Sequence, residues 1–173
     1  MLLGLISDTH GYFDPRLPDI FRGVERILHA GDIGGMEMIN LLAEIAPVVA
    51  VHGNSDRGFV VSRFPLRQDI TIDGVSIHLA HRLEDATSGP RVVVYGHAHE
   101  PSVAGKGGIL YINPGVAGRT RYPAGRSVAL LRLDGGEARA EIIALGPAQE
   151  GAPFASTSQA RPARPSGCRG GGV

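Results

Sequence analysis

The sequence has no tryptophan, only 5% aromatic residues and no excess charge of either sign. Lys and Arg together number 17, as do Asp and Glu, so the formal net charge is zero. Proteins that bind nucleic acid usually present a basic surface or aromatic side chains on which bases stack. We therefore expect no nucleic-acid groove.

Cysteine and long apolar runs are also scarce. Cys168 is the single cysteine, which excludes an internal disulfide framework and fits a reducing cytoplasm. No apolar run approaches the roughly 20 residues that span a membrane. The apolar residues 1–6 lack the basic flank of a signal peptide. We expect a cytoplasmic protein with no membrane segment.

What is present is an ordinary globular mixture of 173 residues, 43% hydrophobic and 20% charged, enough for one domain. We predict a folded domain over residues 1–146. Residues 147–173 are rich in Pro, Gly, Ala and Arg and contain one large apolar side chain, Phe154. Such a segment buries too little surface to offset its conformational entropy, so we predict a disordered tail.

The first third of the domain alternates strands and helices. Short apolar runs predict buried strands at 2–6, 26–30 and 48–51. Asp14-Pro15 predicts an N-cap that opens a short helix toward Arg22. Helical spacing of apolar residues predicts a second helix over 35–46, which Pro47 ends.

The later part is richer in strands. Asp73-Gly74 and Asp134-Gly135-Gly136 are typical hairpin turns between apolar runs. The predicted strands cover 69–72, 75–80, 92–95, 109–112, 127–133 and 138–144.

Polar side chains follow the predicted strands at the point where each ends, which is where open α/β sheets bind ligands. They are Asp8, His10, Asp32, Asn54, His81, His97 and His99. Each motif alone would suggest a strand cap. Their repetition is hard to explain structurally, because buried His and Asp side chains are costly unless paired or metal-bound.

Such oxygen and imidazole ligands suit divalent Mn, Fe, Ni or Zn. Asp8 and His10, or His97 and His99, would share one face of an extended chain and reach one ion. The carboxylate of Asp32 could bridge two metals about 3.5–4 Å apart. We read His29 and His78 instead as structural histidines.

The motifs, taken in order, resemble those of the calcineurin-like metallophosphoesterases. The match is more specific to the small YfcE-type phosphodiesterase branch, which also contains the eukaryotic retromer scaffold subunit. It rests on Asp8-x-His10, Gly31-Asp32, Gly53-Asn54-Ser55-Asp56, His81, Gly96-His97-Ala98-His99-x-Pro101 and Ile112-Asn113-Pro114-Gly115.

This resemblance implies an α/β fold, a four-layer α/β/β/α sandwich of two mixed β-sheets flanked by helices. It also implies two divalent metal ions as cofactors, manganese first, with zinc, nickel or iron as alternatives. One ion would be held by Asp8, His10, Asp32 and His99, and the other by Asp32, Asn54, His81 and His97.

The implied activity is a phosphoesterase, and within it a phosphodiesterase, that hydrolyses a small phosphorylated substrate with a metal-bridging hydroxide. Asp32 and Asn54 would be the catalytic residues, and Asp56 would orient a ligand or a loop from behind. The alternative is a catalytically weak scaffold or interaction protein on the same fold. A homo-oligomer is left open.

The sequence departs from the branch at several positions. Arg82 stands where the branch has glycine, and we interpret Arg82 and His52 as candidate substrate contacts. Only ten residues, 82–91, connect His81 to the next strand, where the branch places a helix. Val116 replaces a frequent serine. Ser55 occupies the position of the histidine acid of larger relatives, so we expect the leaving group to depart unassisted.

Overall fold

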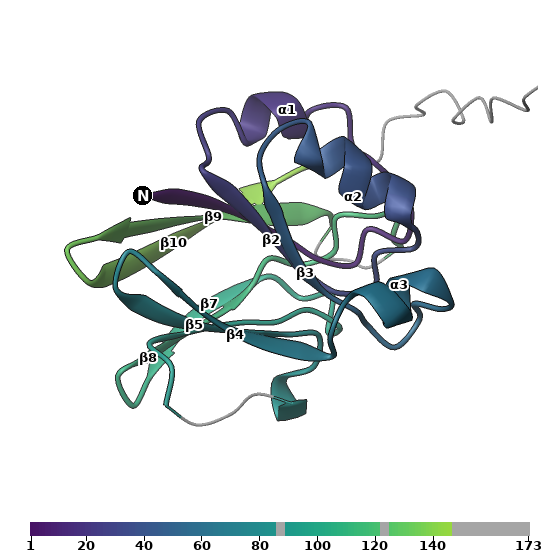
Figure 1. Ribbon diagram of the computed structural model, residues 1–173. Coiled ribbons are helices and arrows are strands. Elements are labelled where there is room, and N and C mark those ends of the chain that lie inside the picture. Colours follow the sequence, from purple (N-terminus) through teal and green to yellow (C-terminus); the bar gives the residue numbers. More distant parts are fainter. Residues whose placement is uncertain (86–88, 122–124, 147–173) are drawn as a thin grey trace, which may run out of the picture.

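A computed structural model describes residues 1–85, 89–121 and 125–146 (Figure 1). The predicted tail, residues 147–173, therefore lies outside the described residues and stays a prediction. So does the middle of the 82–91 connection.

One five-stranded sheet has the order β10-β9-β1-β2-β3. β1 (Leu2–Ile6), β2 (Arg26–Ala30) and β3 (Val48–Val51) are parallel. β9 (Ser127–Asp134) and β10 (Glu137–Ala144) form a hairpin that adds to β1 in the antiparallel sense.

The second sheet has the order β4-β5-β6-β8-β7 and faces the first (Figure 1). Its central strands β5 (Val75–Ala80), β6 (Val92–Val94) and β8 (Ile109–Asn113) are parallel. Its edges, β4 (Arg67–Ile72) and β7 (Ser102–Lys106), are antiparallel to their neighbours. Two mixed five-stranded sheets with helices confirm the predicted α/β sandwich.

The helices are short and distributed unequally. α1 (Leu17–Ile20) and α2 (Met36–Ala43) cover the outer face of the first sheet, and α3 (Phe59–Arg63) follows β3 (Figure 1). On the outer side of the second sheet, the described residues contribute only the 3-10 turn η1 (Leu83–Asp85).

Two hydrophobic clusters explain why the strands read as continuous apolar runs. Leu28 of β2 packs between the two sheets, whereas its neighbour Ile27 packs under the helices with Phe21. Strands buried on both faces need apolar residues at every position. The first sheet is thus packed on both faces, which fixes where its strands end.

The predicted strands are all present, with ends shifted by no more than two residues. The predicted helix start is wrong, because α1 begins at Leu17 with Arg16 as its N-cap. The Asp14 carboxylate accepts a hydrogen bond from Arg16 N at 3.0 Å and is paired with the guanidinium groups of Arg16 and Arg126. Neither α3 nor β7 was predicted, since one is only five residues long and the other is an exposed edge strand. Among the described residues, no helix is long and apolar enough to cross a membrane.

Candidate metal centre

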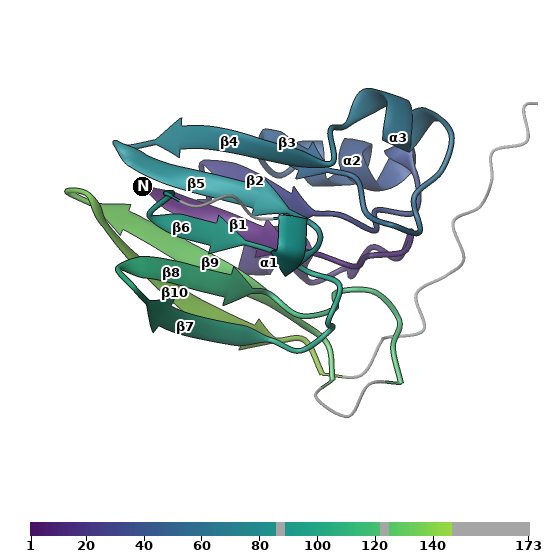
Figure 2. The same cartoon turned by 90° about the horizontal axis from the view of Figure 1, so that it is seen from below.

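The carboxyl ends of β1, β2 and β3 in one sheet and of β5 and β6 in the other lie at the same end of the sandwich (Figure 2). The loops that follow these strands carry all seven predicted ligands: Asp8, His10, Asp32, Asn54, His81, His97 and His99. The fold therefore brings side chains from five separate strands to one place.

Two groups of these side chains place one potential ligand atom each within 4.8 Å of one another. Asp8, His10 and His99 form the first group, and Asp8, Asp32 and His81 form the second. Within the first, His99 Nε2 lies 3.2 Å from Asp8 Oδ1.

Asp32, a member of the second group, also approaches the first. Its Oδ2 is 3.9 Å from His10 Nε2, and its Oδ1 is 3.5 Å from His81 Nε2. Asn54 and His97 complete the set on the His81 side. Asn54 Oδ1 is 3.1 Å from His81 Nε2, and the rings of His81 and His97 are 5.2 Å apart, edge to face.

His81 is oriented by a hydrogen bond from behind. Its Nδ1 lies 2.8 Å from the Ala30 carbonyl oxygen, which can only accept, so Nδ1 carries the proton. The lone pair of Nε2 consequently points to Asp32 and Asn54. Metal-binding histidines commonly show this arrangement, because the second nitrogen fixes tautomer and ring orientation. The donor set, mixed carboxylate and imidazole with one amide oxygen, fits a divalent metal.

Most of the ligands have left-handed backbone conformations. Outside glycine, positive φ occurs in the described residues at the hairpin residue Asp73 and at Asp8 (φ 53°), His10 (46°), Asp32 (53°), His97 (66°) and His99 (58°). The expectation that the two i, i+2 pairs are extended is wrong. Tight turns, not strand alternation, aim these side chains, and each costs backbone strain that the surrounding fold must hold.

Backbone hydrogen bonds hold the first two ligand loops together. Asp8 N donates to Gly31 O and His10 N donates to Asp32 O, both at 3.0 Å. Asp56 ties the second loop to the third. Its buried carboxylate accepts from Ile33 N, Gly34 N and Gly53 N at 3.1, 2.9 and 2.8 Å. The structure thus places Asp56 behind the ligands, as an orienter of the loops.

Glycines allow the ligand loops to approach one another closely. A Cβ on Gly53 would lie 2.1 Å from Asp32 Oδ1, and one on Gly96 would lie 1.9 Å from Ser7 Oγ. A Cβ on Gly31 would lie 2.8 Å from the His81 ring. No side chain other than glycine fits at these three positions without moving a ligand or the hydroxyl that supports it.

The electrostatics favour an ionised carboxylate at Asp8. Burial opposes its ionisation, but hydrogen bonds from His99 and Ser7 outweigh that effect and lower the pKa of the Asp8 carboxyl. Conversely, the hydrogen bond to Asp8 raises the pKa of His99. A divalent cation would replace the proton that His99 and Asp8 share.

His29 was predicted as a structural histidine, and the structure shows what it holds. Gly31 N donates to His29 Nδ1 at 3.2 Å, so His29 Nε2 donates to Thr9 Oγ1 at 2.9 Å. Thr9 Oγ1 in turn donates to Ile33 O at 3.0 Å. This buried chain links the first two ligand loops. Only the apolar context of His29 hinted at it in the sequence.

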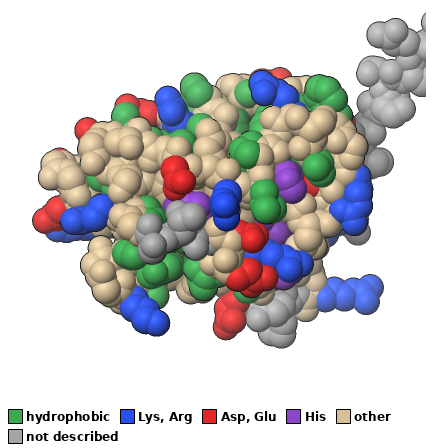
Figure 3. Space-filling view, turned by 60° about the horizontal axis from the view of Figure 1, so that its bottom comes forward, with side chains coloured by type: hydrophobic (Ala, Val, Ile, Leu, Met, Phe, Trp, Pro, Cys, Tyr) green, Lys and Arg blue, Asp and Glu red, His purple; other side chains and the backbone are tan. Residues whose placement is uncertain are grey.

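A pocket of about 280 Å³ opens beside Asn54 and His81. The candidate substrate contacts His52 and Arg82 both line it, together with Leu66. Arg82 Nη1 lies 3.4 Å from Glu84 Oε1, an exposed pair. Figure 3 shows histidine side chains reaching the surface between charged and hydrophobic ones. The sequence motifs did not indicate that Leu66, Glu84 and Asp85 also line this pocket.

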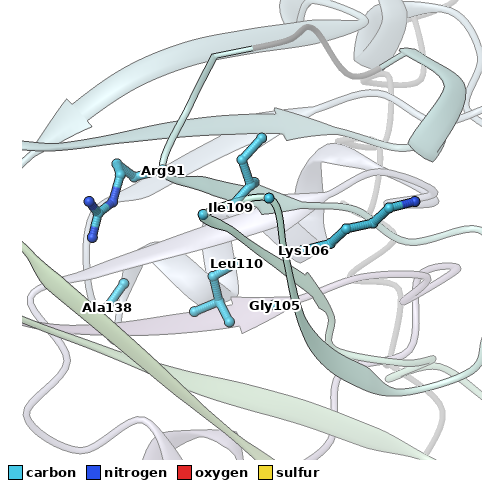
Figure 4. Close-up of a pocket in the computed structure, with 8 residues that line it drawn as sticks. Arg91, Gly105, Lys106, Ile109, Leu110 and Ala138 are labelled. Atoms are coloured by element: carbon cyan, nitrogen blue, oxygen red, sulfur yellow. The ribbon is translucent and has the colours of Figure 1, made fainter.

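A second hollow, of about 320 Å³, lies away from the ligands. Arg91, Lys106, Ile109, Leu110 and Ala138 line it (Figure 4). Arg91 and Ile109 stand at the amino-terminal ends of β6 and β8, whereas the ligands follow the carboxyl ends of the strands. This hollow is not part of the candidate metal centre.

Residues 1–136 match the family model described as a calcineurin-like phosphoesterase superfamily domain. The chain belongs to the calcineurin-like phosphoesterase superfamily. A probable metallophosphoesterase from Methanothermobacter thermautotrophicus is 33% identical over 163 residues, which cover 84% of this chain and 94% of that protein. Membership supports a phosphoesterase with divalent metal ions.

Solved structures of this superfamily share the fold. A structure titled as a novel archaeal phosphodiesterase has a TM-score of 0.66 and 25% identity, covering 83% of this chain and 100% of the other. Vps29 from Entamoeba histolytica, complexed with zinc, has a TM-score of 0.65 and 21% identity, with 83% and 98% coverage. The sequence-based assignment to this branch is confirmed.

Proposed function

We propose that this protein is a phosphodiesterase that binds two divalent metal ions. The observation that carries the proposal is the convergence of the ligand loops, with Asp32 within reach of histidines in both groups. Asp8, His10, Asp32 and His99 would hold one ion. Asp32, Asn54, His81 and His97 would hold the other. Manganese is the first choice, and zinc, nickel or iron also suit these donors.

When bound, such an ion pair lowers the pKa of a water and neutralises charge on a phosphoryl group. The chain's own residues position the reaction. The Asp32 carboxylate accepts a hydrogen bond from Ser55 N at 2.9 Å, which fixes one oxygen toward His81. The Asn54 amide, exposed at the pocket, provides its NH2 group to a phosphoryl oxygen while its Oδ1 faces His81.

The pocket beside Asn54 would take one organic substituent of the diester. Leu66 provides an apolar contact, and Arg82 provides a cation at the pocket wall. His52 stands at the pocket with Nδ1 3.3 Å from Gly53 O. Since the Ser55 hydroxyl is too weak an acid to protonate a departing oxygen at neutral pH, we infer a substrate with a leaving group that departs without a general acid.

The second candidate is a scaffold. The Vps29 structures, at 16–21% identity, show the fold alone. The seven ligands favour the enzyme, because a scaffold gains nothing from five strained polar residues at its strand ends. A cytoplasmic location and a homo-oligomer remain proposals.

Metal analysis tests the proposal directly. After chelation and reconstitution with manganese, the wild type should bind about two ions per chain, as a two-metal site requires, and should hydrolyse bis(p-nitrophenyl) phosphate. Asp32→Asn should weaken the binding of both ions, and His99→Ala should weaken mainly the binding of one. The control His52→Ala should bind both ions as the wild type does. A wild type that binds no metal, or binds it without hydrolysing any phosphoester, would remove the enzyme proposal and favour the scaffold.

A further inference from the structure

The loop that follows β8 lies directly against the first ligand segment. Ala117 N donates to Ser7 O at 3.0 Å, and Gly118 N donates to Asp8 O at 2.9 Å. A Cβ on Gly118 would be 2.5 Å from Thr9 O. The next residue, Arg119, therefore leaves this loop beside the segment that carries Asp8 and His10.

Tyr12 connects the two segments. Its backbone N–H donates to Thr9 O at 2.8 Å, in the turn that contains His10. The guanidinium carbon of Arg119 lies 5.2 Å from the centroid of the Tyr12 ring. That of Arg126 lies 4.7 Å from the same centroid. A tyrosine two residues after a metal ligand thus carries two cations on its ring.

Arg126 has a structural role, because its guanidinium is buried and bonded within the protein. It is 3% exposed, its Nε is 3.1 and 2.9 Å from the carbonyl oxygens of Ala117 and Gly118, and its Nη2 is 2.7 Å from Asp14 Oδ2. Burial works against the charge of Asp14, but contacts with Arg16 and Arg126 prevail and hold the pKa of that carboxyl well below its usual range. Arg126 thereby braces the loop and the Tyr12 ring.

Arg119 differs from Arg126 in being exposed. Within residues 1–85, 89–121 and 125–146 it makes the Tyr12 contact but no hydrogen bond or ion pair. Asp14 pairs with Arg16 and Arg126, whereas Arg119 has no acidic partner among the described residues. The N–H groups of the Arg119 guanidinium can therefore bind a phosphate through two parallel hydrogen bonds, in bidentate fashion.

Sheet order places this cation on the other side of the ligands from the His52–Arg82 pocket. The strands run β9-β1-β2-β3, with Tyr12 after β1 and Arg126 before β9, while His52 follows β3. A diester phosphate held between them would direct one substituent into the pocket and the other toward Arg119.

We propose that Arg119, held on the Tyr12 ring, forms a second anion subsite that binds a further phosphate on one substituent of the substrate. The protein then prefers phosphodiesters that carry a second phosphate over diesters with uncharged substituents. This inference rests on the proposed phosphodiesterase function, and it names the substrate class of that same site.

The test compares the p-nitrophenyl ester of thymidine 5′-phosphate with the same ester carrying a 3′-phosphate, using the manganese-reconstituted protein. The wild type should favour the second ester about tenfold in kcat/KM, mainly through KM, as one added charged contact allows. Arg119→Gln should abolish the preference while leaving kcat on bis(p-nitrophenyl) phosphate unchanged. Arg119→Lys should retain only part of the preference, because the lysine ammonium cannot form the bidentate contact of a guanidinium.

Arg121→Gln is the matched control, since it removes an arginine that is also exposed but has no contact with Tyr12 in the described part of the chain. It should keep most of the preference. Equal losses in Arg119→Gln and Arg121→Gln would indicate general charge attraction and overturn the subsite, as would a wild type with no preference.

Binding of thymidine 3′,5′-bisphosphate, measured by calorimetry, separates the subsite from the enzyme function. If Arg119→Gln weakens this binding about tenfold while manganese stoichiometry stays the same, the subsite stands even where hydrolysis is absent. If hydrolysis proceeds and the bisphosphate binds both proteins equally, the function stands and the subsite is wrong.

Discussion

Gly53 and Asp32 are packed so closely that residue 53 has no room for a side chain. A Cβ on Gly53 would lie 2.1 Å from Asp32 Oδ1 and 2.4 Å from Asp32 N. The same Oδ1 accepts from Ser55 N and faces His81. The position of the central carboxylate therefore depends on a residue that has no ligand atom of its own.

Gly53→Ala should accordingly damage the metal centre without removing a ligand. We expect metal affinity to fall about tenfold or more, comparable to the loss of an outer contact of a ligand. Titration of the chelated protein with manganese measures this. Gly105→Ala is the control, because a Cβ there meets nothing within 4 Å. An unchanged affinity in Gly53→Ala would show that Asp32 moves freely.

The strained backbone at His10 predicts an unusual order of stabilities. At φ 46° alanine is strained and glycine is not. His10→Gly should therefore unfold with a free energy about 1 kcal/mol higher than His10→Ala in the metal-free protein. Urea denaturation measures the difference. At the exposed helical residue Glu37 the order should reverse, with glycine about 1 kcal/mol less stable than alanine.

Buried His29 should make the fold sensitive to acid. Burial lowers the pKa of His29 to about 4, below its usual 6.5. Between these values the unfolded chain binds a proton that the folded chain does not, so stability rises with pH through this window and is fully present above it. The wild type should lose about 3 kcal/mol more than His29→Gln between neutral pH and pH 4.

Denaturant unfolding of the metal-free proteins across that pH range gives the comparison. Asp8 and His99 also titrate, but they are common to both proteins, so the difference between the two curves isolates His29. Parallel curves would mean that His29 is protonated in the fold, contrary to its hydrogen bonds with Gly31 and Thr9.

Ser55 predicts a strong dependence of rate on the leaving group. In a series of aryl phosphodiesters, rates should rise steeply with the acidity of the phenol, because departure is unassisted. Ser55→His should flatten this slope and help poor leaving groups most. Arg82→Gly is the control, and it should raise KM without changing the slope. A shallow slope in the wild type would show that another group, His52 first, already donates the proton.

The sequence by itself determined which residues come together at the candidate metal centre. Apolar runs of four to six residues, each followed by Asp, Asn or His, predict both the strands and the ligands. This succeeds because parallel strands end at one edge. The hairpin at Asp73-Gly74 also follows from a local pattern, whereas the two facing sheets were implied by the resemblance to the calcineurin-like metallophosphoesterases.

Only the tertiary structure decided how these residues are held. The left-handed turns at Asp8 and His10 are imposed by hydrogen bonds from loops 20 or more residues away, which no local pattern shows. The same is true of Asp14, which the chain's local sequence favours as a helix cap. In the fold its Oδ1 accepts from Arg16 N at 3.0 Å, and its Oδ2 also pairs with Arg126, more than 100 residues distant, a charged contact that no local pattern shows.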